Sequence, residues 1–440
     1  MFNKIYLPCL FGVESILAQE LQDLGYAKSQ IEVNDAMVSL TPAPADDFAD
    51  QVAYLNINLR TAERVLLGLA RGRTEDFDQL YELVKGIAWT QILDPGYFIE
   101  VKGYSRKSKL HSLPACQRII KKAIVDRMLE SRPGEGRDKG RRAGRGDKLK
   151  LEENPKKGIN RIQFALVKDS VQIFLETSGD PLHKRGYRPI SHKAPLRETL
   201  AAAILALSFY KKNIANREVL WDPFCGSGTF PIEAALVATE TAPGLGRKFA
   251  AEKYQIIGQK CFVRQRKLAK GKSLLYREDF KLCEEADERH DFLLPGQRPR
   301  IFASDISEEA LAMTLAHAKR AGVAKMLEIF QKDIHQAKLE ELTRRFSVDR
   351  VLICGNPPYG ERLDNPAAAK KIAKSLASLC FTTTHELKPG LRLSLISSDE
   401  KLEEELGRAA DKRRKLYNGG LKCTLYHYFK SPRQPRAENL

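Results

Sequence analysis

Residues 218–240, EVLWDPFCGSGTFPIEAALVATE, decide the fold class of this 440-residue chain. EVLWDPFC (218–225) is typical of an apolar strand, and PIEAALVATE (231–240) is typical of a helix. The intervening glycines allow a tight turn and a close approach to a ligand, and the first N–H groups of the helix are free to bind one. By itself, this pattern fits a plain turn as well as a ligand loop.

The glycine loop differs from the two common phosphate-binding motifs. It lacks the G-x-x-x-x-G-K-[ST] pattern of a P-loop, and Pro231 stands where G-x-G-x-x-G would need its last glycine. A dinucleotide is therefore disfavoured.

Strand-like and helix-like segments alternate on both sides of the glycine loop. Helices are expected at 194–210, 308–322 and 371–387, and strands at 300–307, 325–334, 347–355, 391–398 and 423–430. This alternation predicts an α/β fold with a mainly parallel, doubly wound sheet. Residues 244–300 interrupt it as a long polar insertion.

The first 180 residues follow a different pattern and predict an α+β region with small sheets. Helical spacing occurs at 14–25, 56–73 and 115–130, a strand at 96–105, and a hairpin at 161–179 around Lys168-Asp169. Residues 131–158 are rich in glycine and arginine and predict a disordered loop. That loop is either a tolerated insertion or a flexible contact for RNA.

Composition narrows the possible partners. The net charge is +17, and 43% of the residues are hydrophobic. Clustered basic residues favour a polyanion, most simply nucleic acid, although charge alone fits RNA, DNA, an acidic membrane surface or merely a basic soluble protein.

The sequence also argues against membrane, secreted and metal-binding proteins. We find no transmembrane run and no signal peptide. Eight scattered cysteines without C-x-x-C, and histidines without H-x-x-x-H, favour a reducing cytoplasmic setting and no metal site.

Two aspartates follow the next two expected strands. Asp305 could bind ribose hydroxyls, and Asp333 could accept from an adenine amine. Either one alone fits a helix cap equally well. With the glycine loop, they outline a crevice for a ligand that contains adenosine.

The segment CGNPPYGERL (354–363) ends another strand with two prolines, which stiffen the loop. The Asn356 amide oxygen and the Pro357 carbonyl can hold both hydrogens of an exocyclic amine and free its lone pair for attack. Tyr359 offers a face on which a flipped base can stack. A rigid turn is the alternative interpretation.

The order of these motifs resembles that of class I S-adenosylmethionine-dependent methyltransferases acting on exocyclic amines. PLHKRGYRPISHKAPLRETLAAA (181–203) and GERL (360–363) are similar to the THUMP-containing guanine-N2 methyltransferases, especially the bacterial 23S rRNA group. The resemblance implies a Rossmann-like catalytic domain at 181–440, after a ferredoxin-like domain at 1–65 and a THUMP domain at 66–180. Some members of the group carry a second methyltransferase domain. This sequence shows the motifs of a single methyltransferase domain, so a single methylation is expected.

The resemblance also implies roles for particular residues. S-adenosylmethionine would be held by Asp222, Phe224, Gly226, Gly228, Asp305 and Asp333; guanine by Asn356, Pro357 and Tyr359; and RNA by Arg185, Arg188, Arg197 and Arg362. The expected substrate is a guanosine of 23S rRNA, with no membrane, metal or partner protein. Alternatives are tRNA guanine, adenine N6 in DNA, a protein glutamine, and an inactive RNA-binding assembly factor.

Overall fold

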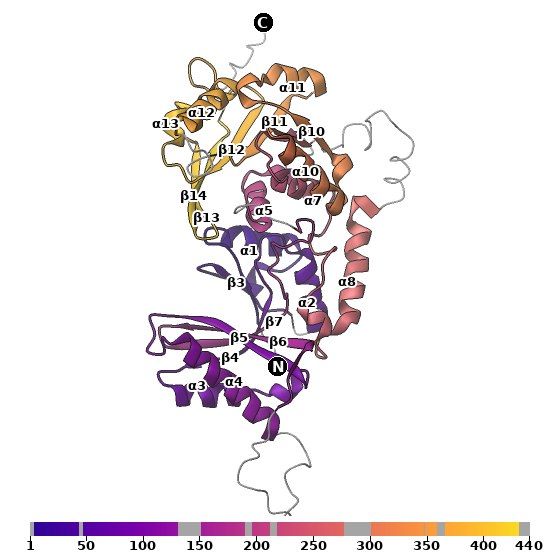
Figure 1. Ribbon diagram of the computed structural model, residues 1–440, viewed down its shortest axis with the longest axis vertical. Helices are drawn as coiled ribbons and strands as arrows, with labels where there is room; N and C mark the ends of the chain where they lie inside the picture. The colour runs from indigo at the N-terminus through magenta and orange to yellow at the C-terminus, as the bar shows by residue number, and fades with distance from the viewer. Residues whose placement is uncertain are drawn as a thin grey trace, which may run out of the picture.

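The computed structural model describes residues 4–43, 47–130, 151–189, 196–211, 218–276, 301–346, 348–358 and 366–430. The molecule is elongated, with the N-terminal half at the lower end of Figure 1 and the C-terminal domain at the upper end. Each half is built on a seven-stranded sheet. The α/β class is confirmed.

One continuous sheet forms the N-terminal half, so the expectation of several small sheets was wrong. Its order is β2-β3-β1-β4-β7-β6-β5, and among the described strands of this sheet β5–β6 is the only parallel pair. The strands are β1 Ile5–Pro8, β2 Ile31–Asn34, β3 Met37–Leu40, β4 Leu66–Arg73, β5 Tyr97–Arg106, β6 Asn154–Val167 and β7 Ser170–Glu176. The β6–β7 hairpin turns at Lys168 and Asp169, as the sequence predicted.

The helix expected at 56–73 is instead a helix end followed by a strand. Helix α2 (Phe48–Asn58) stops there, and β4 pairs with β7 on one side and with β1 on the other. Leu66 and Leu67 are buried by this pairing. Long-range strand pairing therefore overrides a local helical pattern.

The loop expected at 131–158 ends earlier than predicted, because β6 already begins at Asn154. Residues 131–150 lie outside the described part of the chain.

Helices cover one face of the N-terminal sheet. They are α1 (Glu14–Asp23), α2, α3 (Phe77–Lys85) and α4 (Leu113–Glu130). Helix α8 (Gly258–Lys272), from the expected polar insertion, also packs here against α2 and adds Phe262 and Ala269 to this core. Figure 1 shows α8 running alongside α2, so the insertion joins the two halves.

The C-terminal sheet has the order β10-β9-β8-β11-β12-β14-β13. Its strands are β8 Glu218–Asp222, β9 Ile301–Asp305, β10 Leu327–Gln331, β11 Arg350–Gly355, β12 Leu391–Ser397, β13 Lys412–Asn418 and β14 Leu421–Tyr428. The pairs from β10 to β12 are parallel, and β13 and β14 are antiparallel. The mainly parallel sheet is therefore confirmed, with a terminal hairpin whose first strand the sequence did not reveal.

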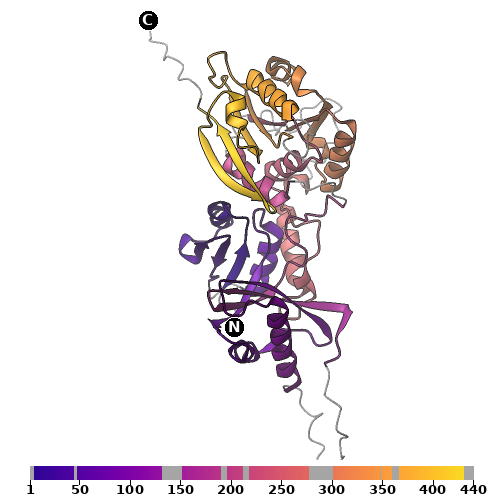
Figure 2. The same cartoon turned by 60° about the vertical axis from the view of Figure 1, so that its left-hand side comes forward.

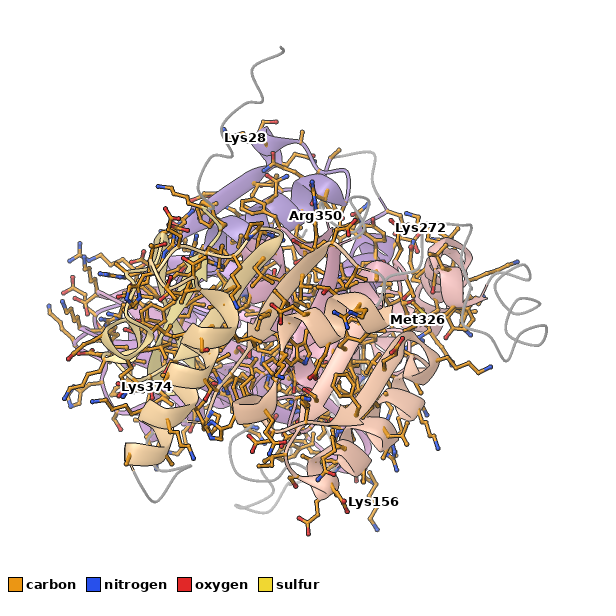
Figure 3. The ribbon with its side chains drawn as sticks, turned by 90° about the horizontal axis from the view of Figure 1, so that it is seen from above. Lys28, Lys156, Lys272, Met326, Arg350 and Lys374 are labelled. Carbon is orange, nitrogen blue, oxygen red and sulfur yellow. The ribbon has the colours of Figure 1, made fainter. Side chains whose placement is uncertain are left out.

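Helices cover both faces of the C-terminal sheet. One core contains α5 (Glu198–Leu207), α7 (Thr229–Ala238) and α10 (Glu308–Ala321). The other contains α12 (Pro366–Cys380) and α13 (Leu402–Leu406), and α11 (Leu339–Phe346) lies before β11. Seen end-on in Figure 3, Arg350 at the start of β11 lies between Met326 beside β10 and Lys374 on α12.

The strand order reverses between β8 and β11. From β8 the chain proceeds outward through β9 to β10, and then returns to the other side of β8 at β11. Ligands of open α/β sheets bind at the carboxyl ends of the strands at such a reversal. Asp222 ends β8 and Gly355 ends β11, so the glycine loop and the Asn-Pro-Pro segment flank this reversal.

Candidate cofactor and methyl-acceptor site

The glycine loop is tied to the neighbouring strand β9. The Cys225 N–H donates to the Ser304 carbonyl at 3.0 Å, and the Gly226 N–H donates to Oδ2 of Asp305 at 2.9 Å. Helix α10 supports the loop from below, because Oγ1 of Thr314 donates to the Gly226 carbonyl at 2.9 Å. The loop is thus fixed in shape before a ligand binds.

Two glycines of the site are closely surrounded by other groups. Gly228, at φ +82° and at the N-terminus of α7, would place a Cβ 2.8 Å from Cγ2 of Thr314. A Cβ on Gly355 would lie 3.1 Å from Oδ1 of Asp222 and 3.4 Å from Cδ2 of Phe224. The switch point is therefore a close-packed cradle of backbone and carboxylate.

Asp222 forms the floor of this cradle. Its side chain is buried, and Oδ1 accepts from the Phe224 N–H at 3.0 Å. Burial raises the pKa of the Asp222 carboxyl well above its usual range, and the negative charge of Asp305 acts in the same direction. A cation bound between the two carboxyls would favour the ionised form, so the pair suits a positively charged ligand.

Asp305 and Asp333 follow strands that are paired with each other. Asp305 pairs with Gln331, which places Asp333 two residues beyond the paired end of β10. Oδ1 of Asp333 accepts from the His335 N–H at 2.9 Å and caps the short helix Ile334–Gln336. Asp333 therefore has the cap role that the sequence left open, at the same sheet edge as the other two carboxylates.

The Asn-Pro-Pro segment follows β11 directly. Asn356 is half-buried and Pro357 is buried. Pro357 and Pro358 border a small cavity of about 10 Å³ with Ile372 and Leu376 of α12. The prolines and α12 thus line one small cavity. The stiffness of this loop stays a prediction. Tyr359 and Arg362 lie outside the described residues.

Arg185, which we expected to contact RNA, has a buried guanidinium. The side chain is 2% exposed and forms an ion pair with Glu233 at 3.4 Å. It also donates to the carbonyls of Leu182 and Arg60. Arg185 therefore links the N-terminal half to α7.

Arg188 and Arg197 have other ion-pair partners than Arg185 and are more exposed. Arg188 is 8% exposed, forms an ion pair with Glu198 at 2.7 Å, and donates to Oγ1 of Thr229 in the first turn of α7 at 3.0 Å. Arg197 is 34% exposed and forms an ion pair with Glu63 at 2.9 Å. Of the three described arginines, Arg197 offers the most surface to a ligand.

A cavity of about 760 Å³ lies beside these arginines. Its lining is mostly basic and includes His183, Lys184, Arg188, Arg197, Arg247 and Lys248, with Asp180 and Glu198 as acids. Because Arg188 contacts the first turn of α7, the cavity adjoins the helix that follows the glycine loop.

Sequence reasoning missed the residues of α10 that hold the glycine loop. Thr314 and His317 are buried and contact the carbonyls of Gly226 and Ser227. Their spacing of three places both on one helix face. Two polar residues on the buried stripe of an amphipathic helix were the available signal.

The doubly wound sheet, the glycine cradle and the carboxylates at successive strand ends define a class I S-adenosylmethionine-dependent methyltransferase. The model of the RMKL-like methyltransferase domain matches residues 185–427. The chain belongs to this family, and S-adenosylmethionine is its cofactor. The RlmL ferredoxin-like domain matches residues 4–66, and the THUMP domain matches residues 74–134.

Named relatives cover the whole chain. It is 32% identical over 430 residues to "Putative RNA methyltransferase YpsC" of Bacillus subtilis, covering 97% of both. It is 30% identical to the ribosomal RNA large subunit methyltransferase K/L of Psychromonas ingrahamii, with 98% of this chain aligned to 51% of that protein. The chain thus spans about half the length of this K/L relative.

Solved structures with the same architecture also align end to end. A possible methylase from Clostridium difficile 630 has a TM-score of 0.80 at 35% identity, covering 99% of this chain and all of that one. "SMU.472, a putative methyltransferase complexed with SAH" (S-adenosylhomocysteine), has a TM-score of 0.77 at 27% identity, covering 98% of this chain and 99% of that one. No helix in the described ranges is long and apolar enough to cross a membrane.

Proposed function

We propose that this protein transfers the methyl group of S-adenosylmethionine to the exocyclic N2 amine of a guanosine in 23S rRNA. One observation carries the proposal: the Asn356-Pro357-Pro358 segment ends the strand next to the glycine cradle, across the topological switch from Asp222. An acceptor amine held by this segment would face a donor held by the cradle.

We assign each residue of the cradle to one portion of the cofactor. The backbone at Gly226 and Gly228 and the carboxylate of Asp222 would hold the methionine part of the cofactor, Asp305 its ribose, and Asp333 its adenine. The bound cofactor supplies a sulfonium methyl group, which is electrophilic. The carboxylates fix its position, and positioning provides most of the acceleration of such a transfer.

Asn356 and the carbonyl of Pro357 would act on the acceptor. Two oxygen acceptors hold both N–H bonds of the planar amine, and this draws its lone pair out of conjugation with the base. After attack the amine is strongly acidic, so its proton leaves to water and no strong general base is required. Tyr359 would stack on the target base. We expect no metal in this reaction.

The domain matches and the named relatives support an RNA substrate. The K/L relatives are named for the ribosomal large subunit, and a THUMP match precedes the catalytic domain. Arg197 and Arg188, at the basic cavity, would contact the RNA backbone beside the target. We propose the boundaries 1–65, 66–180 and 181–440 for the three domains.

Methyl transfer from tritiated S-adenosylmethionine to separately purified 23S rRNA, tRNA and duplex DNA tests the proposal. Wild type is compared with Asn356→Ala and with Asn34→Ala, an exposed asparagine of the N-terminal sheet. We expect label on 23S rRNA that digests to N2-methylguanosine, is lost in Asn356→Ala, and persists in Asn34→Ala.

Other outcomes separate the alternatives. Label on tRNA would keep the chemistry and change the substrate, whereas N6-methyladenine in DNA would replace the guanine assignment. Cofactor binding without label on any of the three would refute catalysis on these free nucleic acids and favour an assembly factor.

A further inference from the structure

Among the described residues, no helix covers one face of the strands β4 to β7, although Leu66, Ala165 and Phe174 on that face are buried together with Tyr6 packed against them. Ile162, Phe164 and Leu166 of β6 point to the other face and are buried in the core under α3 and α4. In Figures 1 and 2, α3 and α4 lie below these strands at the lower end of the molecule. The uncovered face is therefore turned toward the methyltransferase end.

Strand register specifies which side chains share this face. Tyr104 of β5 pairs with Ala165 of β6, Ala165 with Gln172 of β7, and Gln172 with Arg71 of β4. The adjacent rows run from Arg106 to Arg73 and from Lys102 to Gly68 through the same pairings. We call this surface the open face; its members are Arg71, Arg73, Lys102, Tyr104, Arg106, Gln163 and Gln172.

The open face is positively charged and accessible. Lys102 pairs with Glu100 at 2.8 Å with its side chain 66% exposed, and Arg73 pairs with Glu75 at 2.8 Å. Arg71 and Arg106 have no carboxylate within ion-pair distance among the described residues, and both are exposed. Exposed cations of this kind are available to release counterions from phosphates.

An aromatic ring stands within this field of cations. Tyr104 is 51% exposed on the edge strand β5 and pairs with Ala165, which is buried in a small cluster with Leu66 and Phe174. Adjacent strands are about 4.8 Å apart, so Tyr104 and Arg71 are separated by about 14 Å across one row. That span fits two to three nucleotides, with a base on the tyrosine and a phosphate at the arginine.

We propose that the open face binds a single-stranded segment of the substrate RNA, with Tyr104 stacking on a base and Arg71 and Arg106 holding phosphates. The inference rests on the proposed RNA substrate and specifies the surface that grips it. A single strand fits better than a duplex because stacking on a side chain needs an unstacked base. Gln163 and Gln172 lie in the same rows and can hydrogen-bond base edges.

Fluorescence anisotropy with a labelled single-stranded oligoribonucleotide and its duplex tests this surface in the full chain. The variants are Tyr104→Ala, Tyr104→Phe and the pair Arg71→Ala/Arg106→Ala. Arg118→Ala/Lys122→Ala removes two exposed cations from α4, on the covered side of the sheet, and serves as the matched control. Binding of S-adenosylmethionine by each variant is measured separately by calorimetry.

We expect Tyr104→Ala to weaken single-strand binding about 5- to 150-fold, the range of one stacking contact, and Tyr104→Phe to retain it. The double arginine variant should reduce the slope of log K against log salt by about 1.4, twice the value for one phosphate on a single strand. The α4 control should keep the wild-type slope, and all variants should bind the cofactor normally.

Wild-type RNA affinity and salt slope in both open-face variants would overturn the inference and leave the methyltransferase proposal intact. Equal losses in the α4 control would overturn it as well, because they would indicate a diffuse electrostatic effect. A wild-type chain that binds cofactor but no RNA would overturn the inference together with the RNA substrate.

Discussion

Gly228→Ala offers a direct test of the cofactor cradle. Gly228 has φ +82°, a conformation that costs a residue with a Cβ about 1–2 kcal/mol. The new methyl group would also lie 2.8 Å from Cγ2 of Thr314. Since Oγ1 of Thr314 donates to the Gly226 carbonyl, relief of this contact displaces the loop that holds the cofactor.

Gly322→Ala is the matched control for backbone strain. Gly322 has φ +75° at the C-terminal cap of α10, and nothing lies within 4 Å of a Cβ built there. Both variants therefore carry a similar backbone penalty, and only Gly228→Ala adds a contact inside the cradle. Thermal unfolding should show similar losses of stability from the backbone term.

Isothermal titration with S-adenosylmethionine distinguishes the two variants. We expect Gly228→Ala to raise the dissociation constant about tenfold or more, because about 1.4 kcal/mol is needed to restore the loop. Gly322→Ala should bind as wild type. Equal affinities in all three proteins would refute the assignment of this loop as the cofactor cradle.

Three further substitutions test the support of the site. Glu233→Gln leaves the buried guanidinium of Arg185 uncompensated and should lower the free energy of unfolding in urea by about 3–5 kcal/mol; an unchanged midpoint would refute the linking role of this ion pair. Asp305→Asn turns an amide N–H toward a backbone donor such as Gly226 and should weaken cofactor binding about tenfold in the same titration, whereas wild-type affinity would show that the carboxylate is dispensable. Burial lowers the pKa of His427 from 6.5 to about 4. The folded state then binds fewer protons than the unfolded state between these values, so stability is full above pH 6.5 and falls by about 3 kcal/mol as the pH drops to about 4. His427→Gln should flatten this pH dependence in unfolding measurements, and an unchanged slope would contradict the assignment.

The catalytic half could be predicted well because its signals are local. A buried parallel strand is a short apolar run, and the residue after it stands at the sheet edge, so Asp222, Asp305 and Asn356 could be assigned to one edge from spacing alone. Strand β13, Lys412–Asn418, was missed because it is an edge strand. Edge strands carry charged side chains, and KRRK has no apolar alternation to reveal it.

The N-terminal half was predicted less well because its sheet depends on distant partners. Strand β4 lies between β1, about 60 residues before it, and β7, about 100 residues after it. The segment that supplies Leu66 and Leu67 carries a helical pattern by itself. In the extended conformation those leucines are buried only when both partner strands are in place.

The positions of the arginines in the fold show that a charge pattern in a sequence predicts the kind of partner better than it predicts which residues contact that partner. Arg185 lies in a basic motif and is a reasonable RNA ligand until Glu233, 48 residues later, is placed against it. A buried carboxylate converts that cation into a link between domains. Arg71 and Arg106 have no motif to mark them, yet strand register brings them onto one accessible face, where neither forms an ion pair with a carboxylate of the described residues. The net charge of +17 indicates that a polyanion can bind. Which cations remain available to it is decided by the pairing of strands and carboxylates in the folded chain.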